Sequence, residues 1–247
     1  MDVAGYSVEA VAQALPGREV RVYPALLSTE SDALAWARAG ATEGSVVLAD
    51  YQASPRGRAG LEWTVVPGVT TAFSLILRPP LSSEKEGWLY TVATCGLADA
   101  LGSGTTIEWP DEVRRHGQRA AAVGVHAELG PQGVAWAVVN VIVLRPERSR
   151  IGLVAGIVES IERRYTSAPE AVLDDYLRRL ETIDRHVRAH LIPMGPGGPR
   201  VMGRAVGSLM DGALVLHTER GNRVAVRPQN LGLLEDAAQP SGEPSSD

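Results

Sequence analysis

The stretch "ADYQASPRGRAGLEW" (residues 49–63) joins an apolar run to a short basic loop. The letters "VVL" come directly before it, and this run predicts a buried strand over 44–52. The loop then carries Arg56 and Arg58 on either side of a glycine and ends at Trp63. Such a loop either wraps a phosphorylated or adenylated ligand or is an ordinary solvated basic loop.

Bulk composition narrows the class of protein. With 247 residues, 45% of them hydrophobic and 21% charged, the chain is typical of a soluble globular protein with one large domain or a large and a small one. A net charge of -5 argues against a nucleic-acid binder driven by overall charge, so we expect no nucleic-acid partner. No apolar run reaches the about 20 residues of a spanning helix, and no secretory signal is present, so we expect no membrane association.

Cysteine and histidine usage favours a reducing compartment and no metal centre built from protein ligands alone. The single cysteine, Cys95, cannot form an internal disulfide and is typical of a small core residue, which predicts a cytoplasmic location. His186 and His190 are four residues apart, but the alternation in "HVRAHLI" predicts a strand there. None of the five histidines has metal-ligand spacing with a cysteine.

Up to about residue 150, helices and strands alternate, which is typical of an α/β or α+β domain. The helix over 26–41 has Ser28 and Thr29 as capping residues, acidic residues in its first turn, and Gly40 at its end. The further expected elements are strands at 44–52, 70–80 and 105–113 (the last interrupted by Pro110), a buried helix at 87–102, paired strands at 120–129 and 133–144 with "GPQG" as the turn, and helices around 151–161 and 172–180.

After Glu181 the apolar period changes from helical to two. "HVRAHLI", "RVMGRAVGSL", "GALVLHTE" and "NRVAVRP" alternate apolar and polar residues and are separated by turn-forming sequences. Four or five short strands in this span predict a small barrel. We therefore divide the chain into a domain at 1–182, a small β domain at 183–236 and a disordered tail at 237–247, which lacks apolar content.

Together these segments resemble the biotin protein ligases, which are related in fold to the lipoate ligases. The resemblance runs from about Ser28 to Leu234. It rests on the Ser28-Thr29-Glu30 opening, the loop "SPRGRAGLEW" after Gln52, the segment "EWPDE", the strand start "RAAAV" and the strand "WAVVN". It implies an α+β fold, in which a mixed-sheet ligase-like domain with helices is followed by a small SH3-like β-barrel.

The resemblance also implies an activity and a set of site residues. In the family, biotin attacks the α-phosphate of ATP, and a lysine of a carrier domain then takes the acyl group from the adenylate. Arg119 stands where the catalytic lysine would be, and Asp111 and Glu112 stand at the metal-binding position. The implied ligand and adenylate contacts come from Ser28, Thr29, Gln52, Arg56, Gly57, Arg58, Trp63 and Asn140. ATP, Mg²⁺ and biotin are the expected ligands if the family activity is retained.

Several positions depart from the family pattern. Pro55 replaces a loop glycine and cannot donate a backbone hydrogen bond, and Glu108 replaces a lysine, which reverses a charge. Glu108, Asp111 and Glu112 place three carboxylates in five residues, which should repel a triphosphate. In the family's Gly-x-Gly-x-Asn strand, Trp136 and Val138 replace the two glycines beside the biotin ring and should fill part of the pocket.

From these departures we predict a ligase fold whose adenylation site is degraded and which acts by binding. The expected partner is a biotin-carrier or lipoyl-type domain, a carboxylase subunit or an active ligase. The alternative is an active, divergent ligase that uses biotin or another carboxylic acid. A repressor role requires a helix-turn-helix domain, and only about 25 residues precede Ser28, too few for one. The apolar strand "VAWAVVNVIVL" is compatible with a homodimer formed through the sheet.

Overall fold

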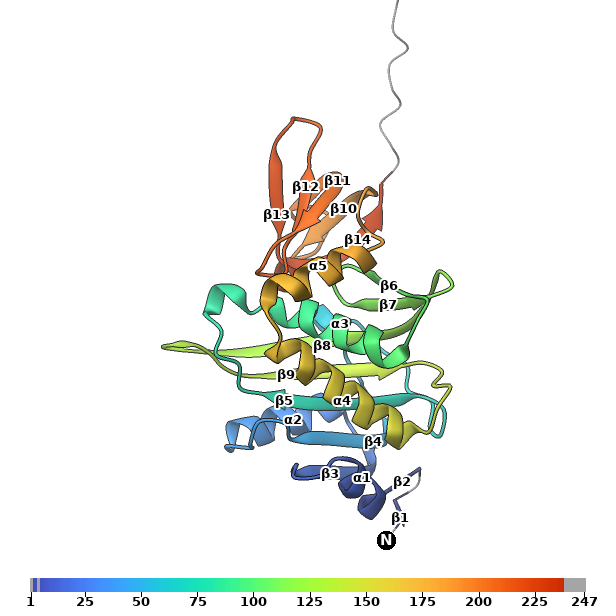
Figure 1. Cartoon of the computed structure of the whole chain (residues 1–247). Coiled ribbons are helices and arrows are strands. Elements are labelled where there is room, and N and C mark those ends of the chain that lie inside the picture. The colour runs from blue at the N-terminus through green and yellow to red at the C-terminus, as the bar shows by residue number, and fades with distance from the viewer. Residues whose placement is uncertain (1, 4, 238–247) are drawn as a thin grey trace, which may run out of the picture.

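The computed structural model describes residues 2–3 and 5–237, which form a large mixed sheet with helices and a smaller antiparallel sheet (Figure 1). The large sheet has seven strands in the order β3-β4-β5-β9-β8-β7-β6. Only β3 and β4 pair in parallel; every other neighbouring pair is antiparallel. The strands are β3 (Val20–Leu26), β4 (Val46–Gln52), β5 (Thr71–Leu77), β6 (Thr105–Glu108), β7 (Glu112–Arg115), β8 (Gln118–Gly130) and β9 (Gly133–Val143). The α+β class is confirmed.

Helices cover both faces of this sheet. The long helices α3 (Trp88–Leu101) and α4 (Arg150–Thr166) lie on one face with α5 (Pro169–Arg179) beside them, and they bury the main core there (Figure 1). On the other face α2 (Thr29–Arg38) packs a smaller core. The α2 helix begins as predicted, since the Ser28 side chain accepts a hydrogen bond from the Ser31 N–H.

The β8–β9 hairpin forms the centre of the sheet, and Pro131 and Gln132 form its turn, as predicted. The two strands pair along nearly their whole length, and Gly124 lies opposite Asn140. Since alternate residues of a strand share a face, Trp136, Val138 and Asn140 project toward the α2 side. The hairpin therefore carries several of the predicted site residues on one face.

The segment expected as one strand interrupted by Pro110 forms a hairpin instead. β6 ends at Glu108 and β7 begins at Glu112, and the two strands pair antiparallel with Glu108 opposite Glu112. The turn consists of Trp109, Pro110 and Asp111, with a cis bond before the proline. Because the chain reverses here, the three carboxylates of the segment come closer together than in a continuous strand.

The N-terminal residues form elements that the sequence patterns did not indicate. β1 (Asp2–Val3) pairs with β2 (Tyr6–Ser7), and α1 (Val8–Ala14) leads into the sheet edge strand β3. Tyr6 is buried, and the Arg150 guanidinium lies 4.3 Å from its ring centroid. Arg150 also forms a 2.6 Å ion pair with Asp50, so this segment is fixed to both β4 and α4.

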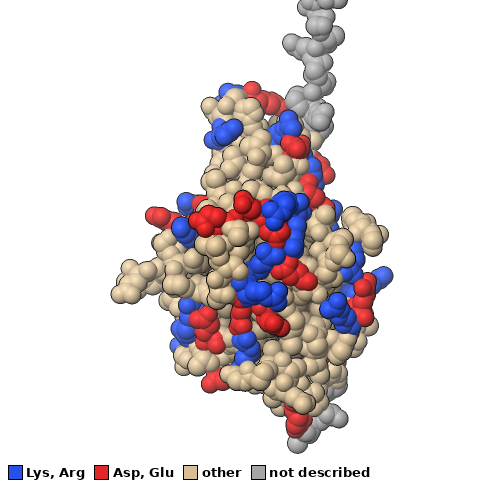
Figure 2. All heavy atoms as spheres, viewed as in Figure 1, with Lys and Arg blue, Asp and Glu red and all other residues tan. Residues whose placement is uncertain are grey.

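An ion-pair network joins the three helices of the larger core. Asp99 of α3 accepts hydrogen bonds from Arg164 of α4, and Asp175 of α5 pairs with the same arginine at 2.5 Å. Arg179 contacts both carboxylates. Figure 2 shows the resulting alternation of acidic and basic atoms over this helical face. The network therefore accounts for the densest charge on that side without requiring a ligand.

Five C-terminal strands form the second sheet, in the order β13-β12-β11-β10-β14. They are β10 (His186–Leu191), β11 (Arg200–Ser208), β12 (Leu214–His217), β13 (Arg223–Val226) and β14 (Leu231–Asp236). The period-two pattern is therefore confirmed, and His186 and His190 lie on a strand as expected. Residues 238–247 of the predicted tail lie outside the described residues. No helix in the described part of the chain is long and apolar enough to cross a membrane.

Candidate functional site

The loop that follows β4 is closed on itself. The Gly57 N–H donates to the Leu61 carbonyl at 2.7 Å, and the Trp63 N–H donates to the Pro55 carbonyl at 3.1 Å. Arg56 forms an exposed ion pair with Glu62 at 2.9 Å. A Cβ added at Gly57 would lie 2.4 Å from the Trp63 indole nitrogen, so only glycine allows the indole to pack on the loop backbone.

Arg58 points inward from this loop and is buried. Its Nε lies 3.2 Å from the Asp111 carboxylate in the β6–β7 turn. Its guanidinium also donates to the backbone carbonyls of Leu231 and Gly232 at the start of β14. One side chain therefore ties the basic loop to a carboxylate of the large sheet and to the C-terminal sheet.

Every carboxylate of the "EWPDE" segment has an arginine beside it. Glu108 pairs with Arg114 at 2.7 Å and with Arg185 at 2.8 Å. Glu112 lies 3.4 Å from Arg119. Together with the Arg58–Asp111 pair, these contacts neutralise charges that the sequence presented as an unbalanced acidic cluster. Repulsion of a triphosphate by this segment is accordingly smaller than the sequence suggests.

A cavity of about 240 Å³ lies between the loop, the β6–β7 turn and β14. Its lining combines cationic, acidic and apolar side chains, namely Arg58, Arg114, Arg119, Glu108, Asp111, Glu112, Leu61, Trp63 and Leu233, among others. Burial raises the pKa of the Asp111 carboxyl, and the neighbouring Arg58 and Arg119 oppose that shift. Burial likewise raises the pKa of Glu112, against the effect of Arg119. Burial therefore favours the neutral form of both carboxyl groups at the cavity wall, and the neighbouring arginines favour the charged form.

A buried polar network lies at the N-terminus of α2. Gln52 Oε1 accepts hydrogen bonds from the Thr29 N–H at 2.8 Å and from the Thr29 hydroxyl at 3.2 Å. Ser74 Oγ lies 2.8 Å from Thr29 Oγ1 and 2.7 Å from Asn140 Oδ1. Glu30 sits beside this network, where burial raises the pKa of its carboxyl and a hydrogen bond with Asn140 opposes that shift.

Trp136 and Val138 occupy the same face of β9 as Asn140. Val138 is fully buried and Trp136 is 6% exposed, and both pack with Ala33 and Ala37 of α2. The Trp136 ring stacks on His126, with 6.0 Å between the ring centroids. Side chains therefore fill the space between α2 and this part of the strand.

The loop and the polar network meet at Gly124. A Cβ at this position would lie 3.3 Å from Gly57 Cα and 3.4 Å from the backbone nitrogen of Arg58, so the loop backbone packs directly on the strand there. Asn140 is the direct partner of Gly124 on β9. The loop, the cavity and the polar network are consequently neighbouring parts of one site.

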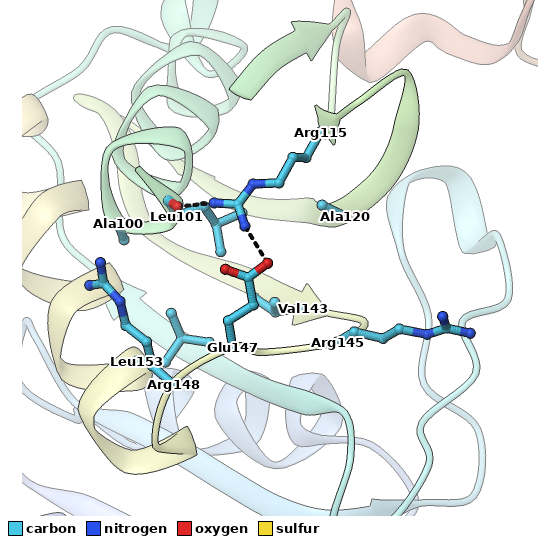
Figure 3. A pocket seen from close by; sticks show the side chains of 9 residues that line it. All are labelled: Ala100, Leu101, Arg115, Ala120, Val143, Arg145, Glu147, Arg148 and Leu153. Atoms are coloured by element: carbon cyan, nitrogen blue, oxygen red, sulfur yellow. Dashed lines mark hydrogen bonds and ion pairs between the residues drawn. The ribbon is translucent and has the colours of Figure 1, made fainter. Parts of the chain in front are cut away.

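A second cavity, drawn in Figure 3, is much smaller. Arg115 spans it by pairing with Glu147 at 2.8 Å and by donating to the Leu101 carbonyl at the end of α3. Its volume is about 40 Å³, too small for a nucleotide or a vitamin-sized acid. Arg145 also lines this cavity, and its side chain extends away from the Arg115–Glu147 pair (Figure 3).

Comparison with known proteins agrees with this fold. The chain is 27% identical over 216 residues to the biotin–[acetyl-CoA-carboxylase] ligase of Mycobacterium tuberculosis, a match that covers 76% of this chain and 79% of that protein. Its fold is similar to that of the Aquifex aeolicus biotin protein ligase in complex with biotin and ATP, with a TM-score of 0.68, 18% identity and coverage of 89% and 99% of the two chains. The chain is therefore similar to biotin protein ligases in sequence and in fold.

A third similarity shows that this fold also occurs in a protein without an established role. The chain matches a biotin protein ligase-like protein of unknown function from Silicibacter with a TM-score of 0.65 and 14% identity, covering 87% of this chain and 95% of that one. No protein-family profile matches the chain. The similarity to the ligases therefore rests on the sequence relative and on the shared fold.

The residues predicted from the ligase resemblance form two groups in the structure, with Gly57 between the groups and Arg56 outside both. Arg58, Trp63, Asp111, Glu112 and Arg119 line the cavity, and Ser28, Thr29, Gln52 and Asn140 belong to the α2 end. Gly57 links the groups through Gly124, whereas Arg56 points outward to Glu62.

Sequence reasoning missed two side chains and one backbone segment of the site. Ser74 completes the polar network, and its only sequence signal was a serine among the apolar residues of the strand "TAFSLIL". Arg114 joins the carboxylate cluster and carried no separate signal. The carbonyls of Leu231 and Gly232 bind Arg58 through backbone atoms, which sequence patterns cannot identify.

The residues at the family's metal position are engaged with arginines. Both Asp111 and Glu112 direct an oxygen toward a guanidinium. Within the described ranges, no group of three or more histidine, cysteine, aspartate or glutamate side chains is arranged to hold a metal ion. Proteins bind Mg²⁺ through one or two carboxylates, and waters and substrate phosphates complete its coordination. Asp111 and Glu112 would hold the ion only by turning from their guanidinium partners, and we derive no step through it.

Proposed function

We propose that this protein is a ligase-fold protein with a degraded adenylation site that acts by binding another protein. The candidate partners are a biotin-carrier or lipoyl-type domain, a carboxylase subunit or an active ligase. Sequence similarity supports a role near biotin-dependent carboxylation, because the similar Mycobacterium tuberculosis protein is a biotin–[acetyl-CoA-carboxylase] ligase. The departures in the site support the loss of adenylate formation.

One observation carries the proposal: Trp136 and Val138 are packed beneath α2 where the resemblance implies bare glycine backbone. Both side chains are enclosed by other core residues, and interiors at normal packing density leave no room for a ring of biotin's size. Admitting biotin would require the indole to leave its stacked position on His126. Such a rearrangement of a packed core costs several kcal/mol, roughly 1–3 for each displaced side chain.

Charge placement supports the same conclusion. Glu30 lies beside Asn140 at the α2 N-terminus, where a carboxylate ligand would otherwise be attracted by the helix dipole. Arg58 already contacts Asp111 and two carbonyls through its Nε and Nη1 atoms, which leaves fewer of its donors for a phosphate. Both features disfavour an anionic adenylate, because Arg58 already has partners and Glu30 adds a carboxyl group beside the network.

Calorimetric titration with biotin and with biotinyl-AMP, with and without Mg²⁺, tests the proposal. We expect no heat of binding from either ligand. If biotinyl-AMP binds tightly, the Arg58→Ala variant decides whether the loop holds it, and Arg56→Ala is the matched control because Arg56 points outward. Tight binding that is lost in Arg58→Ala but kept in Arg56→Ala would contradict the proposal and restore the ligase interpretation.

The cavity supports a second candidate, an active ligase for a different acid. It holds about 240 Å³ and is lined by Arg58, Arg114 and Arg119, which could attract a carboxylate smaller than biotin. In this alternative Arg119 replaces the lysine, although its guanidinium does not act as a compact ammonium. Pyrophosphate release on addition of MgATP with biotin, lipoate or a short-chain acid would establish this activity and overturn the proposal above.

A further inference from the structure

The outer face of the C-terminal sheet carries a row of basic side chains across four strands. His186 of β10 is the direct partner of Arg204 on β11, Arg204 is the partner of His217 on β12, and His217 is the partner of Arg223 on β13. Residues directly opposite each other in a sheet project from the same face, so the four side chains form one line. Alternate residues such as Val187, Ala205 and Leu216 are buried, which places the row on the outside.

Further basic side chains flank this row. Arg188 and His190 follow on β10, and Arg200, the partner of His190, follows on β11. We call these seven residues the basic face: His186, Arg188, His190, Arg200, Arg204, His217 and Arg223. This concentration contrasts with the chain's net charge of -5, so the acidic excess lies elsewhere on the molecule.

Acidic residues balance only part of the basic face. Glu235 contacts His190 at 3.0 Å and Arg188 at 4.0 Å, and Asp184 pairs with Arg204 at 2.6 Å. Arg200 and Arg223 are exposed and form no ion pair with any residue that the structure describes. Unlike the helical network around Asp99, this face therefore has guanidinium groups ready to receive an external carboxylate.

The basic face is continuous with the cavity of the candidate site. Leu233 on β14 is the direct partner of His190, and Leu233 is also a lining residue of the cavity next to Arg58 and Trp63. Exposed Met202 lies opposite Arg188 and adds an apolar contact among the charges. A polypeptide bound along this face would therefore have one end at the cavity mouth.

We propose that the basic face docks an acidic segment of a protein partner and leads it toward the cavity. This inference rests on the proposed function for the partner being a protein, and it adds the partner's chemistry and its docking face. A nucleic acid is a poorer fit, because residues 183–237 contain no phenylalanine, tyrosine or tryptophan on which bases could stack. Carboxylates pair with guanidinium groups in a bidentate geometry that requires no stacking.

A charge-reversal experiment tests the docking face in the full chain. The double variant Arg200→Glu with Arg223→Glu reverses the charge at the two arginines of the face that form no ion pair with a described residue. Its control, Arg145→Glu with Arg148→Glu, makes the same charge change beside the small cavity of Figure 3. The probe is a short poly-glutamate peptide, and its affinity is measured by fluorescence anisotropy at low and at physiological salt. We expect roughly tenfold weaker binding for the first variant and little change for the control.

Three outcomes overturn the inference. They are equal losses in the two variants, a loss in the control alone, and tighter binding of oligo-thymidylate than of poly-glutamate to the unaltered protein. Thermal melts of both variants show whether a loss of binding is caused by unfolding. Double variants with glutamine in place of glutamate at the same positions remove the positive charges without reversing them. The biotinyl-AMP titration gives a separate readout, since adenylate binding would end the proposed function while leaving the docking result interpretable.

Discussion

Arg58 Nε lies 3.2 Å from Asp111 Oδ2, and both side chains are buried. The same guanidinium reaches the backbone of β14, which is 173 residues away in sequence. The loop that the ligase resemblance assigns to adenylate binding is therefore held by the protein's own groups. Because this contact joins the loop to both sheets, variants that break it should also change the unfolding free energy.

Asp111→Asn should destabilise the fold because it leaves the buried Arg58 guanidinium without a full counter-charge. Breaking a buried pair by removing one partner costs about 3 kcal/mol of unfolding free energy. Urea denaturation at neutral pH measures this loss. The control is Glu62→Gln, which breaks the exposed pair with Arg56 and should cost less than about 1 kcal/mol. Similar losses of unfolding free energy in the two variants would show that the buried pair stabilises the fold no more than the exposed one.

Gly57→Ala should open the loop, since its Cβ would lie 2.4 Å from the Trp63 indole nitrogen. We expect a loss of about 1–3 kcal/mol together with faster proteolytic cleavage within residues 53–63. Gly207→Ala is the matched control, because a Cβ there meets no heavy atom within 4 Å. An unchanged cleavage rate in Gly57→Ala would mean that the indole moves without disturbing the loop.

Trp136→Ala should create a cavity between β9 and α2. The tryptophan is 6% exposed and packs with the helix, so removing its ring should lower the unfolding free energy by about 3–5 kcal/mol. Leu129→Ala, on the same hairpin but 52% exposed, should change it by less than about 0.5 kcal/mol. Denaturant titration of the two variants distinguishes a packed indole from a loosely held one.

The Asp99 network should make stability depend on pH. Burial alone would raise the pKa of Asp99, but hydrogen bonds from Arg164 and Arg179 outweigh it and lower the pKa. A lowered folded-state pKa contributes stability above the unfolded value of about 3.9, and this stability is lost as the pH falls through the folded-state pKa. The destabilisation caused by Asp99→Asn should thus be large at neutral pH and small in strong acid.

Urea midpoints at neutral pH and at the lowest pH where the protein remains folded check this dependence. Asp174→Asn provides the control, because Asp174 is exposed on α5 and forms no ion pair within the described ranges. A destabilisation by Asp99→Asn that stays constant with pH would assign the effect to packing rather than charge.

The sequence by itself determined most of the elements and the ligase-like fold. Capping residues marked the start of α2, the switch from helical to two-residue period marked the C-terminal sheet, and "GPQG" marked the central hairpin turn. These signals are local, since they arise from backbone preferences and from the alternation of burial within a few residues. The order of altered motifs was enough to identify the ligase fold.

Only the tertiary structure decided the state of the site. The turn at Trp109 to Asp111 became a hairpin, and Glu108 received Arg114 and Arg185 as partners, one of them 77 residues away. Ser74 and the β14 carbonyls joined the site through packing of distant strands. Such contacts depend on strand order and on which elements stack, and the energy of a charge depends on its neighbours in space rather than in sequence.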